Sequence, residues 1–334
     1  MPLRATSSAL VGDHDLVMLD LDGVVYRGPD AVPGAAEALR RVADRGVGLA
    51  YLTNNASRPA GVVAQHLRDL SMPLNDDGDV VTSAQAVATL MARRLDAGSR
   101  VLVVGGAGLR EALEEHDLVP VAGLDDDPAA VVQGFDPGIG WEQLAEASYA
   151  VAAGLPWYAS NTDMTVPTAR GIAPGNGSLV RAVRTATGQE PVVAGKPERP
   201  LFDETLGRTG ATTPLMVGDR LDTDISGAQA AGIASLWVAT GVHTVDDVVA
   251  ATPGERPDLV GPDLSALLVE HAEVTFEDDR ATCGVAVAEL SDGTIRLTAG
   301  EPGGLEALRA VAALGWTVVD RGDPAPAVDD TMTT

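Results

Sequence analysis

Apolar and polar positions follow a regular rhythm up to about Leu268: a short apolar run, a turn, and then a stretch with helical spacing. The apolar runs predict strands over residues 16–21, 48–53, 101–104, 131–135, 214–217 and 235–239. The helical spacing predicts helices over residues 33–45, 59–70 and 223–231, and helices that begin at Leu109 and Trp141. Strands that alternate with helices in this way are typical of an α/β fold with parallel sheets, which is the fold class we expect.

The pattern changes beyond Leu268, where short strands are expected to follow one another. We expect strands over residues 273–277, 282–290, 294–299 and 316–319, and a helix over residues 305–314. Ser291-Asp292-Gly293 predicts a hairpin turn. Residues 320–334 are polar and contain proline, so we expect a frayed end. Residues 268–334 are therefore interpreted as a small α+β extension.

Parallel α/β sheets bind their ligands at the carboxyl ends of the strands, so the residues directly after each run are candidates for chemistry. The first run ends in Asp20-Leu21-Asp22-Gly23. Carboxylates two residues apart lie on one face of a strand, where one could attack a substrate while the other transfers protons. A strand that ends in an ordinary acidic turn is the alternative, because Asp-Gly is a common turn sequence.

Two further candidates follow later in the chain. Thr53-Asn54-Asn55 offers a hydroxyl and backbone N–H groups that suit a phosphate, or else forms a turn that caps the next helix. Lys196 is the single lysine of the chain, whereas the other 22 basic residues are Arg. Codon usage in a GC-rich gene would leave such a lysine by accident. The other interpretation is a site that needs a compact ammonium group and not a planar guanidinium.

The fourth candidate is the acidic run Asp219-Arg220-Leu221-Asp222-Thr223-Asp224, which follows the strand expected over residues 214–217. Carboxylates that converge without Cys or His suit a hard, oxygen-binding ion such as Mg²⁺. The alternative is an Asp-rich cap for the next helix, a role that would suit Asp222.

In chain order the four motifs are DxDGVVY, TNN, GKP and GDRxxTD, each at an expected strand end. Together they resemble the haloacid dehalogenase superfamily of aspartate-nucleophile phosphatases. TNN and GDRxxTD are similar to the C2-capped branch, subclass IIA, which includes sugar-phosphate, phosphoglycolate and glycerol-phosphate phosphatases. The resemblance covers about residues 16–268. It implies a Rossmann-like core sheet with an inserted α/β cap domain.

The resemblance also implies roles for the matching residues around the metal. Asp20 would attack phosphorus and form an aspartyl-phosphate. Asp22 would protonate the leaving oxygen and then deprotonate the attacking water. Mg²⁺ would be held by the Asp20 carboxylate, the Asp22 carbonyl oxygen and Asp219, and Asp224 would orient this group from the second layer.

Further residues would bind the substrate. By the same resemblance, Thr53 and the Asn54 N–H would hold the phosphoryl oxygens, with Asn55 beside them, and Lys196 would neutralise charge. Arg58 matches a family arginine near the substrate, and a surface residue at the start of a helix explains it equally well.

The stretch between the TNN and GKP motifs is far longer than one strand–helix unit needs, which indicates an inserted domain. We expect the core over residues 12–84 and 187–267, the cap over 85–186 and the extension over 268–334. Within the cap, Asn161 and Asp163 match a family stretch near the substrate, although Thr162 replaces its usual proline. The loop Met164–Pro167 would select the substrate. It carries no charge and no aromatic ring, which favours a small polyol phosphate.

Composition limits the partners. The chain has 334 residues and a formal net charge of −25, which disfavours nucleic acid and anionic membranes as partners. One cysteine excludes an internal disulfide. With neither a signal-peptide pattern nor an apolar run of membrane length, we expect a cytoplasmic location. The extension is interpreted as an interface, and hence as a route to a homo-oligomer.

These observations favour a Mg²⁺-dependent phosphomonoesterase that acts on a small phosphorylated metabolite, with glycerol 3-phosphate as the expected substrate. Phosphoglycolate or a sugar phosphate is the nearest alternative. A phosphotransferase would pass the same aspartyl-phosphate to another acceptor. A non-catalytic binding or regulatory protein on a phosphatase scaffold belongs to a different class, but the chain contains all the residues that catalysis would require.

Overall fold

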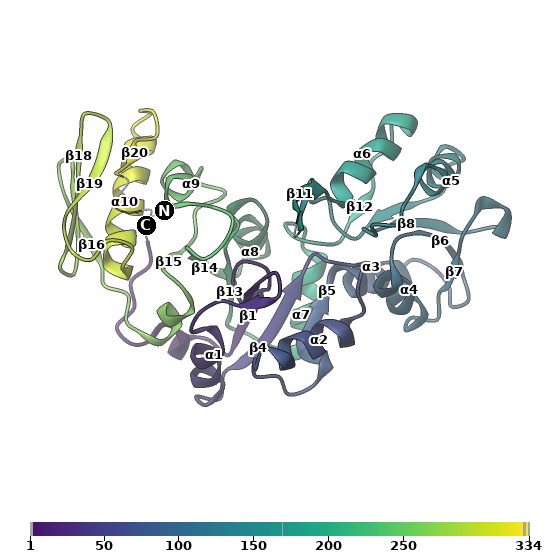
Figure 1. The fold of residues 1–334 in the computed structure, drawn as a ribbon, viewed down its shortest axis with the longest axis horizontal. Helices are drawn as coiled ribbons and strands as arrows, with labels where there is room; N and C mark the ends of the chain where they lie inside the picture. The colour runs from purple at the N-terminus through teal and green to yellow at the C-terminus, as the bar shows by residue number, and fades with distance from the viewer. Residues whose placement is uncertain (1–2, 169, 330–331, 333–334) are drawn as a thin grey trace. The chain divides into compact units, whose positions relative to one another are not determined.

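The computed structural model describes residues 3–168, 170–329 and 332. Its backbone forms two compact units (Figure 1). The first unit takes in the described residues of 1–50, 70–73 and 211–334, and the second those of 51–69 and 74–210. The domain limits expected from the sequence stay a prediction.

The main sheet has six strands in the order β15-β14-β13-β1-β4-β5. Its strands are β1 (Leu16–Asp20), β4 (Gly48–Thr53), β5 (Val80–Thr82), β13 (Pro214–Gly218), β14 (Ala234–Val238) and β15 (Leu259–Gly261). The pairs β1–β13, β13–β14, β14–β15 and β4–β5 are parallel. Most residues of these strands are buried, as expected for apolar strands covered on both faces. The α/β fold class is confirmed.

Short helices and turns of the first unit surround its part of this sheet. The helices and helical turns are η1 (Leu10–Asp13), α1 (Ala35–Ala43), η4 (Leu221–Ile225), α8 (Ser226–Ala231), α9 (Val245–Ala250) and η5 (Leu264–Leu268). A short hairpin joins the strands β2 (Tyr26–Arg27) and β3 (Asp30–Ala31). The helix expected over residues 223–231 is only partly regular. Its first part is the π-type turn η4, in which the N–H of Ile225 bonds to the carbonyl oxygen of Arg220. Such turns are frequent at functional sites.

The C-terminal extension forms a second sheet in this unit. Its strands, in the order β16-β17-β18-β19-β20, are β16 (Val274–Glu277), β17 (Arg280–Cys283), β18 (Ala286–Ser291), β19 (Thr294–Ala299) and β20 (Ala327–Val328). The helix α10 (Leu305–Asp320) contacts β17 and β18 as well as β15 and α9, so it lies between the two sheets (Figure 1). The hairpin turn is confirmed, because Asp292 and Gly293 have φ values of 52° and 72° and join Ser291 to its partner Thr294.

Three expectations for the extension are wrong. The strand expected over residues 282–290 is two strands, interrupted at Gly284, whose φ is 55°. Residues 316–319 lie in α10, since periodicity cannot distinguish an apolar strand from a helix that is buried on most sides. Of the end expected to fray, residues 320–329 contain β20, which pairs with β19 and buries Val328. Residues 330, 331, 333 and 334 lie outside the described residues.

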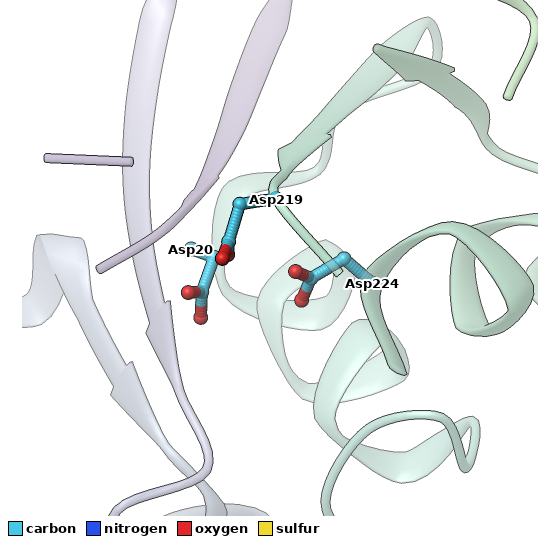
Figure 2. A group of neighbouring side chains, drawn as sticks. All are labelled: Asp20, Asp219 and Asp224. Carbon is cyan, nitrogen blue, oxygen red and sulfur yellow. The ribbon is translucent and has the colours of Figure 1, made fainter. Parts of the chain in front are cut away.

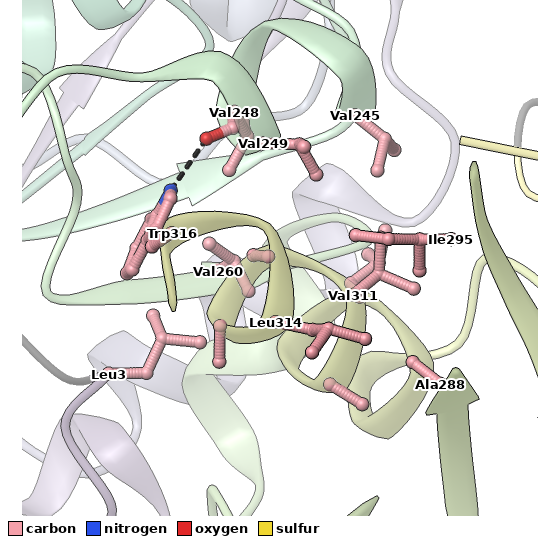
Figure 3. Close-up of a cluster of buried hydrophobic side chains, with 14 of the residues drawn as sticks. Leu3, Val245, Val248, Val249, Val260, Ala288, Ile295, Val311, Leu314 and Trp316 are labelled. Atoms are coloured by element: carbon pink, nitrogen blue, oxygen red, sulfur yellow. Dashed lines mark hydrogen bonds between the residues drawn. The ribbon is translucent and has the colours of Figure 1, made fainter. Parts of the chain in front are cut away.

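The extension shares one apolar cluster with the main sheet, and we call this cluster the extension core (Figure 3). It joins Val311 and Trp316 of α10 to Val260 of β15, Val248 of α9 and Leu3 near the N-terminus. The extension is therefore not a detached appendage, because its helix completes the covering of the main sheet.

A buried arginine fastens the extension to the N-terminal segment. Arg309 is fully buried and donates to the carbonyl oxygens of Ala272 (3.0 Å) and Arg4 (2.8 Å), and Nη1 lies 3.2 Å from Nδ1 of His271. A guanidinium only donates, so Nδ1 accepts and the imidazole proton is on Nε2, which donates to the Ala266 carbonyl oxygen. Burial, together with the charge of Arg309, lowers the pKa of His271 to about 4 against the opposing effect of the hydrogen bond to Ala266.

The second unit contains a five-stranded sheet in the order β12-β9-β8-β6-β7, whose neighbouring strands are parallel. Its strands are β6 (Arg100–Val104), β7 (Val119–Val121), β8 (Ala130–Gln133), β9 (Trp157–Ala159) and β12 (Val192–Val193). The helices and turns are α2 (Ala60–Asp69), η2 (Asp77–Asp79), α3 (Ser83–Ala92), α4 (Ala107–Glu114), η3 (Leu124–Asp126), α5 (Trp141–Ala152), α6 (Asn176–Thr187) and α7 (Pro200–Thr209). An antiparallel hairpin joins β10 (Thr165–Thr168) to β11 (Gly171–Pro174). Among the described residues, no helix is long and apolar enough to cross a membrane.

The buried, neutral His271 makes stability depend on pH. Its pKa is depressed in the folded state, so its contribution is complete above about pH 6.5, the ordinary value, and is lost as the pH falls toward 4. We expect the free energy of unfolding, measured with urea, to fall by up to about 3 kcal/mol across this window from this group.

The variant His271→Gln should be less stable at pH 7 and should show a shallower fall with decreasing pH. His66→Gln, on α2, is the matched control and should keep the full pH dependence. An unchanged pH dependence in His271→Gln would contradict the assignment.

Candidate functional site

Three carboxylates meet at one edge of the main sheet. Asp20 ends β1, Asp219 directly follows β13, and Asp224 belongs to η4, and one oxygen atom from each lies within 4.8 Å of the others (Figure 2). We call these three residues the carboxylate group. Asp20 is half-buried, and the other two are fully buried.

The backbone around Asp219 holds its carboxylate in place. The N–H of Val242 donates to Oδ2 at 2.6 Å, and the indole N–H of Trp237 donates to the Asp219 carbonyl oxygen at 3.0 Å. Gly241 is packed so closely that a Cβ atom there would overlap the carboxylate. Sequence reasoning did not find Trp237, Gly241 or Val242, because their contribution lies in a backbone N–H, an indole N–H and a close approach.

Asp224 and Asp222 have different surroundings although both belong to the same acidic run. Oδ2 of Asp224 accepts the N–H of Arg220 at 3.2 Å, which closes the π-type turn around a buried carboxylate. Asp222 is exposed and pairs with the Arg220 guanidinium at 2.8 Å. Burial raises the pKa of Asp222, but the hydrogen bonds and charge of Arg220 outweigh it and leave the pKa below its ordinary value. The helix-cap alternative for Asp222 is wrong, because its carboxylate is not among the caps of η4 or α8.

Asp22 is not a member of the carboxylate group. It is exposed and forms an isolated bridge with Tyr26, where the chain turns after β1. The N–H of Gly23 donates to the Tyr26 carbonyl oxygen at 2.8 Å and closes this turn. The catalytic role expected for Asp22 stays a prediction.

In the second unit, Asn54 is the hub of a hydrogen-bonded cluster. Its Oδ1 accepts the N–H of Lys196 at 2.8 Å, and its Nδ2 donates to the Lys196 carbonyl oxygen at 3.0 Å and to the Asp163 carboxylate at 3.2 Å. Its own carbonyl oxygen accepts from Nδ2 of Asn161 and from the Ser83 hydroxyl, each at 2.6 Å. We call Asn54, Asn161, Asp163 and Lys196 the Asn54 cluster. The structure thus brings together the TNN motif, the GKP motif and the stretch that contains Asn161 and Asp163.

The members of the Asn54 cluster differ in exposure. Lys196 is 2% exposed and Asn161 is 3% exposed, whereas Asp163 is half-buried. The amide of Asn161 is engaged on both sides, because its Oδ1 accepts the Asp163 N–H at 3.1 Å. Ser83 was missed from the sequence. Asn176 is buried and donates to the Asn161 carbonyl oxygen at 2.7 Å.

The rest of the TNN stretch forms a tight turn. The buried Thr53 accepts the Asn55 N–H on its hydroxyl at 3.1 Å, and Oδ1 of Asn55 accepts from the N–H and the hydroxyl of Ser57. Arg58 is exposed at the start of α2. The binding roles expected for Thr53, Asn55 and Arg58 stay predictions.

Two family models match the chain: haloacid dehalogenase-like hydrolase over residues 17–119, and HAD-hydrolase-like over residues 193–267. A curated relative, D-glycerol 3-phosphate phosphatase of Mycobacterium tuberculosis, is 44% identical over 92% of this chain and 87% of its own. The chain belongs to the haloacid dehalogenase-like hydrolases. The resemblance that the four motifs carry is thereby confirmed.

Two other comparisons place this hydrolase among phosphatases. A crystal structure of glycerol phosphate phosphatase from Mycobacterium tuberculosis in complex with magnesium has a TM-score of 0.84 and 41% identity, over 96% of this chain and 95% of that one. The 5'-nucleotidase YutF of Bacillus subtilis is 37% identical over 69% of this chain and 91% of its own. The enzyme is a phosphatase of the C2-capped branch of the family.

Removing the Asn54 side chain tests whether it holds the Lys196 segment. Asn54→Ala deletes the hydrogen bonds to both backbone groups of Lys196, so we expect a loss of about 1–3 kcal/mol in the free energy of unfolding. Urea denaturation measures it. Asn55→Ala, which removes only a local turn contact, is the control and should lose less; equal losses would contradict the hub assignment.

Proposed function

We propose that this hydrolase is a Mg²⁺-dependent phosphomonoesterase that cleaves glycerol 3-phosphate through an aspartyl-phosphate on Asp20. The observation that carries the proposal is the carboxylate group at the ends of β1 and β13. Its support for this substrate is the 44% identity to an enzyme named for D-glycerol 3-phosphate.

The carboxylate group fits magnesium. Its donors are all carboxylate oxygens, and hard oxygen ligands are those that Mg²⁺ prefers. The Asp20 and Asp219 carboxylates and the Asp22 carbonyl oxygen would hold the ion, and Asp224 would orient them. When bound, Mg²⁺ offsets negative charge on the nucleophile and on the phosphoryl group.

The first half of the proposed reaction forms the covalent intermediate. A carboxylate oxygen of Asp20 attacks phosphorus, and the bond from phosphorus to the ester oxygen breaks. Asp22, as the acid, gives its proton to that oxygen, so the alcohol leaves neutral. The exposed position of Asp22 at the turn after β1 supports this role, since a group that exchanges protons with the leaving alcohol and then with water must be accessible.

The second half returns the enzyme to its starting state. Asp22, now the base, takes a proton from water, and the water oxygen attacks phosphorus. The bond from phosphorus to Asp20 then breaks, and inorganic phosphate leaves. Both halves depend on positioning and charge neutralisation more than on any further covalent chemistry.

The Asn54 cluster is proposed to bind the phosphoryl group. Lys196 supplies a buried cation, and Asn54 holds the main chain on both sides of it, which limits the directions that the ammonium can take. The Thr53 hydroxyl and the Asn54 N–H would bind the phosphoryl oxygens. A compact ammonium suits a small anion here better than a guanidinium does.

Substrate selection is proposed to fall to the uncharged loop Met164–Pro167 at the start of the β10–β11 hairpin, together with Asn55, Arg58 and Asp163. Met164 is 47% exposed, so it is available for contact. Asn161 would act indirectly, because its amide is engaged with Asn54 and Asp163. A loop without charge suits the small polyol of glycerol 3-phosphate. The homo-oligomer formed through residues 268–334 stays a prediction.

Replacing the proposed nucleophile should abolish turnover without unfolding the protein. Asp20→Asn keeps the shape of the side chain but cannot attack phosphorus, so we expect at least a ~1,000-fold loss of kcat. Release of inorganic phosphate from p-nitrophenyl phosphate measures it. Asp222→Asn, at an exposed carboxylate of the acidic run over residues 219–224, is the control and should keep its turnover. Retained turnover in Asp20→Asn would show that Asp20 is not the nucleophile.

The substrate is tested by comparing phosphate esters. We expect kcat/KM for glycerol 3-phosphate to exceed the values for phosphoglycolate, sugar phosphates and a 5'-nucleotide, and EDTA to remove activity until Mg²⁺ is restored. A higher kcat/KM for another ester would show that this ester is the substrate, and the proposed reaction would still stand. A new ester in place of inorganic phosphate would indicate a phosphotransferase. Full turnover without a divalent ion would show that the reaction does not require Mg²⁺.

A further inference from the structure

The loop over residues 239–244, between β14 and α9, touches the metal-binding residues from two sides. Its Val242 N–H donates to Oδ2 of Asp219 at 2.6 Å. Its His243 accepts on Nδ1 the N–H of Leu221, at 2.8 Å, from the first residue of η4. The position of the loop therefore sets both the direction of the Asp219 carboxylate and the start of the turn that carries Asp224.

The same loop also holds the segment that follows Asp20. The Thr240 hydroxyl donates to the Gly23 carbonyl oxygen at 2.6 Å, and the Arg27 guanidinium donates to the Thr240 carbonyl oxygen, with Nε at 2.6 Å. The 239–244 loop thus links the ends of β1 and β13, on which the carboxylate group depends.

The loop continues into α9, which is too short to be stable alone. Thr244 caps the helix through a reciprocal pair of hydrogen bonds with Asp247. Helices of about a dozen residues or fewer are marginal in water and take their stability from packing, so whatever packs on the six residues of α9 determines where the loop lies.

The C-terminal extension supplies that packing. The indole N–H of Trp316 donates to the Val248 carbonyl oxygen at 2.7 Å, near the end of α9 (Figure 3). The same oxygen also accepts the N–H of Ala251, the residue that ends the helix, at 3.2 Å. Gly315 lies so close to α9 that a Cβ atom there would be 2.5 Å from Cγ1 of Val249. From β20, the Val328 N–H donates to the Asp246 carboxylate at 3.1 Å.

A buried arginine closes the contact at the far end of α9. Arg256 is 4% exposed and donates from Nε to the Ala251 carbonyl oxygen at 3.0 Å, while Nη2 lies 2.8 Å from the Asp320 carboxylate at the end of α10. Its guanidinium also lies over the Trp316 ring, 5.3 Å from the ring centre. These contacts hold the second half of α9 against α10, and β20 holds its first turn through Asp246.

We propose that the C-terminal extension positions the metal-binding carboxylate Asp219, with Trp316 acting through α9 and His243 on the 239–244 loop. Trp316 and His243 are positioning residues, and the ligand they affect is a divalent cation. The proposal rests on the proposed function only for its kinetic readout, because metal binding can be measured without substrate.

Trp316→Phe tests the link, since it keeps an aromatic ring in the extension core and removes the side-chain donor to the Val248 carbonyl oxygen, which keeps only the longer hydrogen bond from the Ala251 N–H at 3.2 Å. We expect the dissociation constant for Mg²⁺, measured by calorimetry, to rise about 3- to 10-fold, the size of effect that one lost hydrogen bond produces. Cys283→Ala is the matched control, because Cys283 is buried in the same core on β17 and makes its hydrogen bond to Ala272, away from α9. Cys283→Ala should change the Mg²⁺ dissociation constant less than twofold, while it lowers the free energy of unfolding by about as much as Trp316→Phe does.

The path through the loop is tested by a double-mutant cycle. His243→Ala should weaken Mg²⁺ binding by a similar factor, and His243→Asn should restore most of it, because an amide oxygen can accept the Leu221 N–H. The double variant Trp316→Phe/His243→Ala should bind Mg²⁺ no more weakly than His243→Ala alone, since both act on one element. If Trp316→Phe does not fold, Gly315→Ala provides a second disturbance of α9.

Two results would overturn the proposal: Mg²⁺ affinity unchanged within twofold in Trp316→Phe or in Gly315→Ala, or effects that multiply in the double variant. Either would leave the extension as a cover for the main sheet. If the unaltered protein showed no phosphatase activity, that result would instead count against the proposed function. The Mg²⁺ measurements would still decide whether the extension positions Asp219.

Discussion

Three like-charged carboxylates drawn to within 4.8 Å at one sheet edge repel one another, and the rest of the first unit is arranged around this constraint. Two of them are fully buried, where charge is costly unless it is hydrogen-bonded and shared with a cation. Backbone N–H groups of Val242 and Arg220 each bond to one oxygen of these two carboxylates, and each comes from an irregular segment. The π-type turn η4 and the loop after β14 are therefore consequences of burying these carboxylates.

In the Asn54 cluster, a neutral side chain holds a buried charged residue through hydrogen bonds to its backbone. A buried lysine must be held in one direction to be useful, and the amide of Asn54 has the donor and the acceptor needed to bind both backbone groups of Lys196. The carbonyl oxygen of Asn54 in turn accepts from Ser83 and Asn161, so one short turn organises segments that are far apart in the sequence. Through these hydrogen bonds Asn54 holds the segment after β12 in place, and with it the buried Lys196.

The expectations that failed have a common cause. Residues 316–319 are apolar without a clear period, and only contact with α9 and β15 makes them part of a helix. The strand expected over residues 282–290 is divided by a turn at Gly284, where the nearby Glu306 carboxylate accepts the Val285 N–H. Asp222 has the residue type of a helix cap, but its carboxylate pairs with the Arg220 guanidinium instead. In each case a tertiary contact outweighed a local preference.

The sequence by itself determined the α/β class, the main strands and the four ordered motifs, because apolar periodicity and chemistry at strand ends are local properties. It therefore also pointed to Asp20, Asp219, Asp224, Asn54 and Lys196. Only the tertiary structure decided how these groups are held: by backbone N–H groups, an indole and a close-packed glycine that carry no sequence signal of their own. It likewise decided that the C-terminal extension packs on α9, since contacts between distant segments depend on the folded chain.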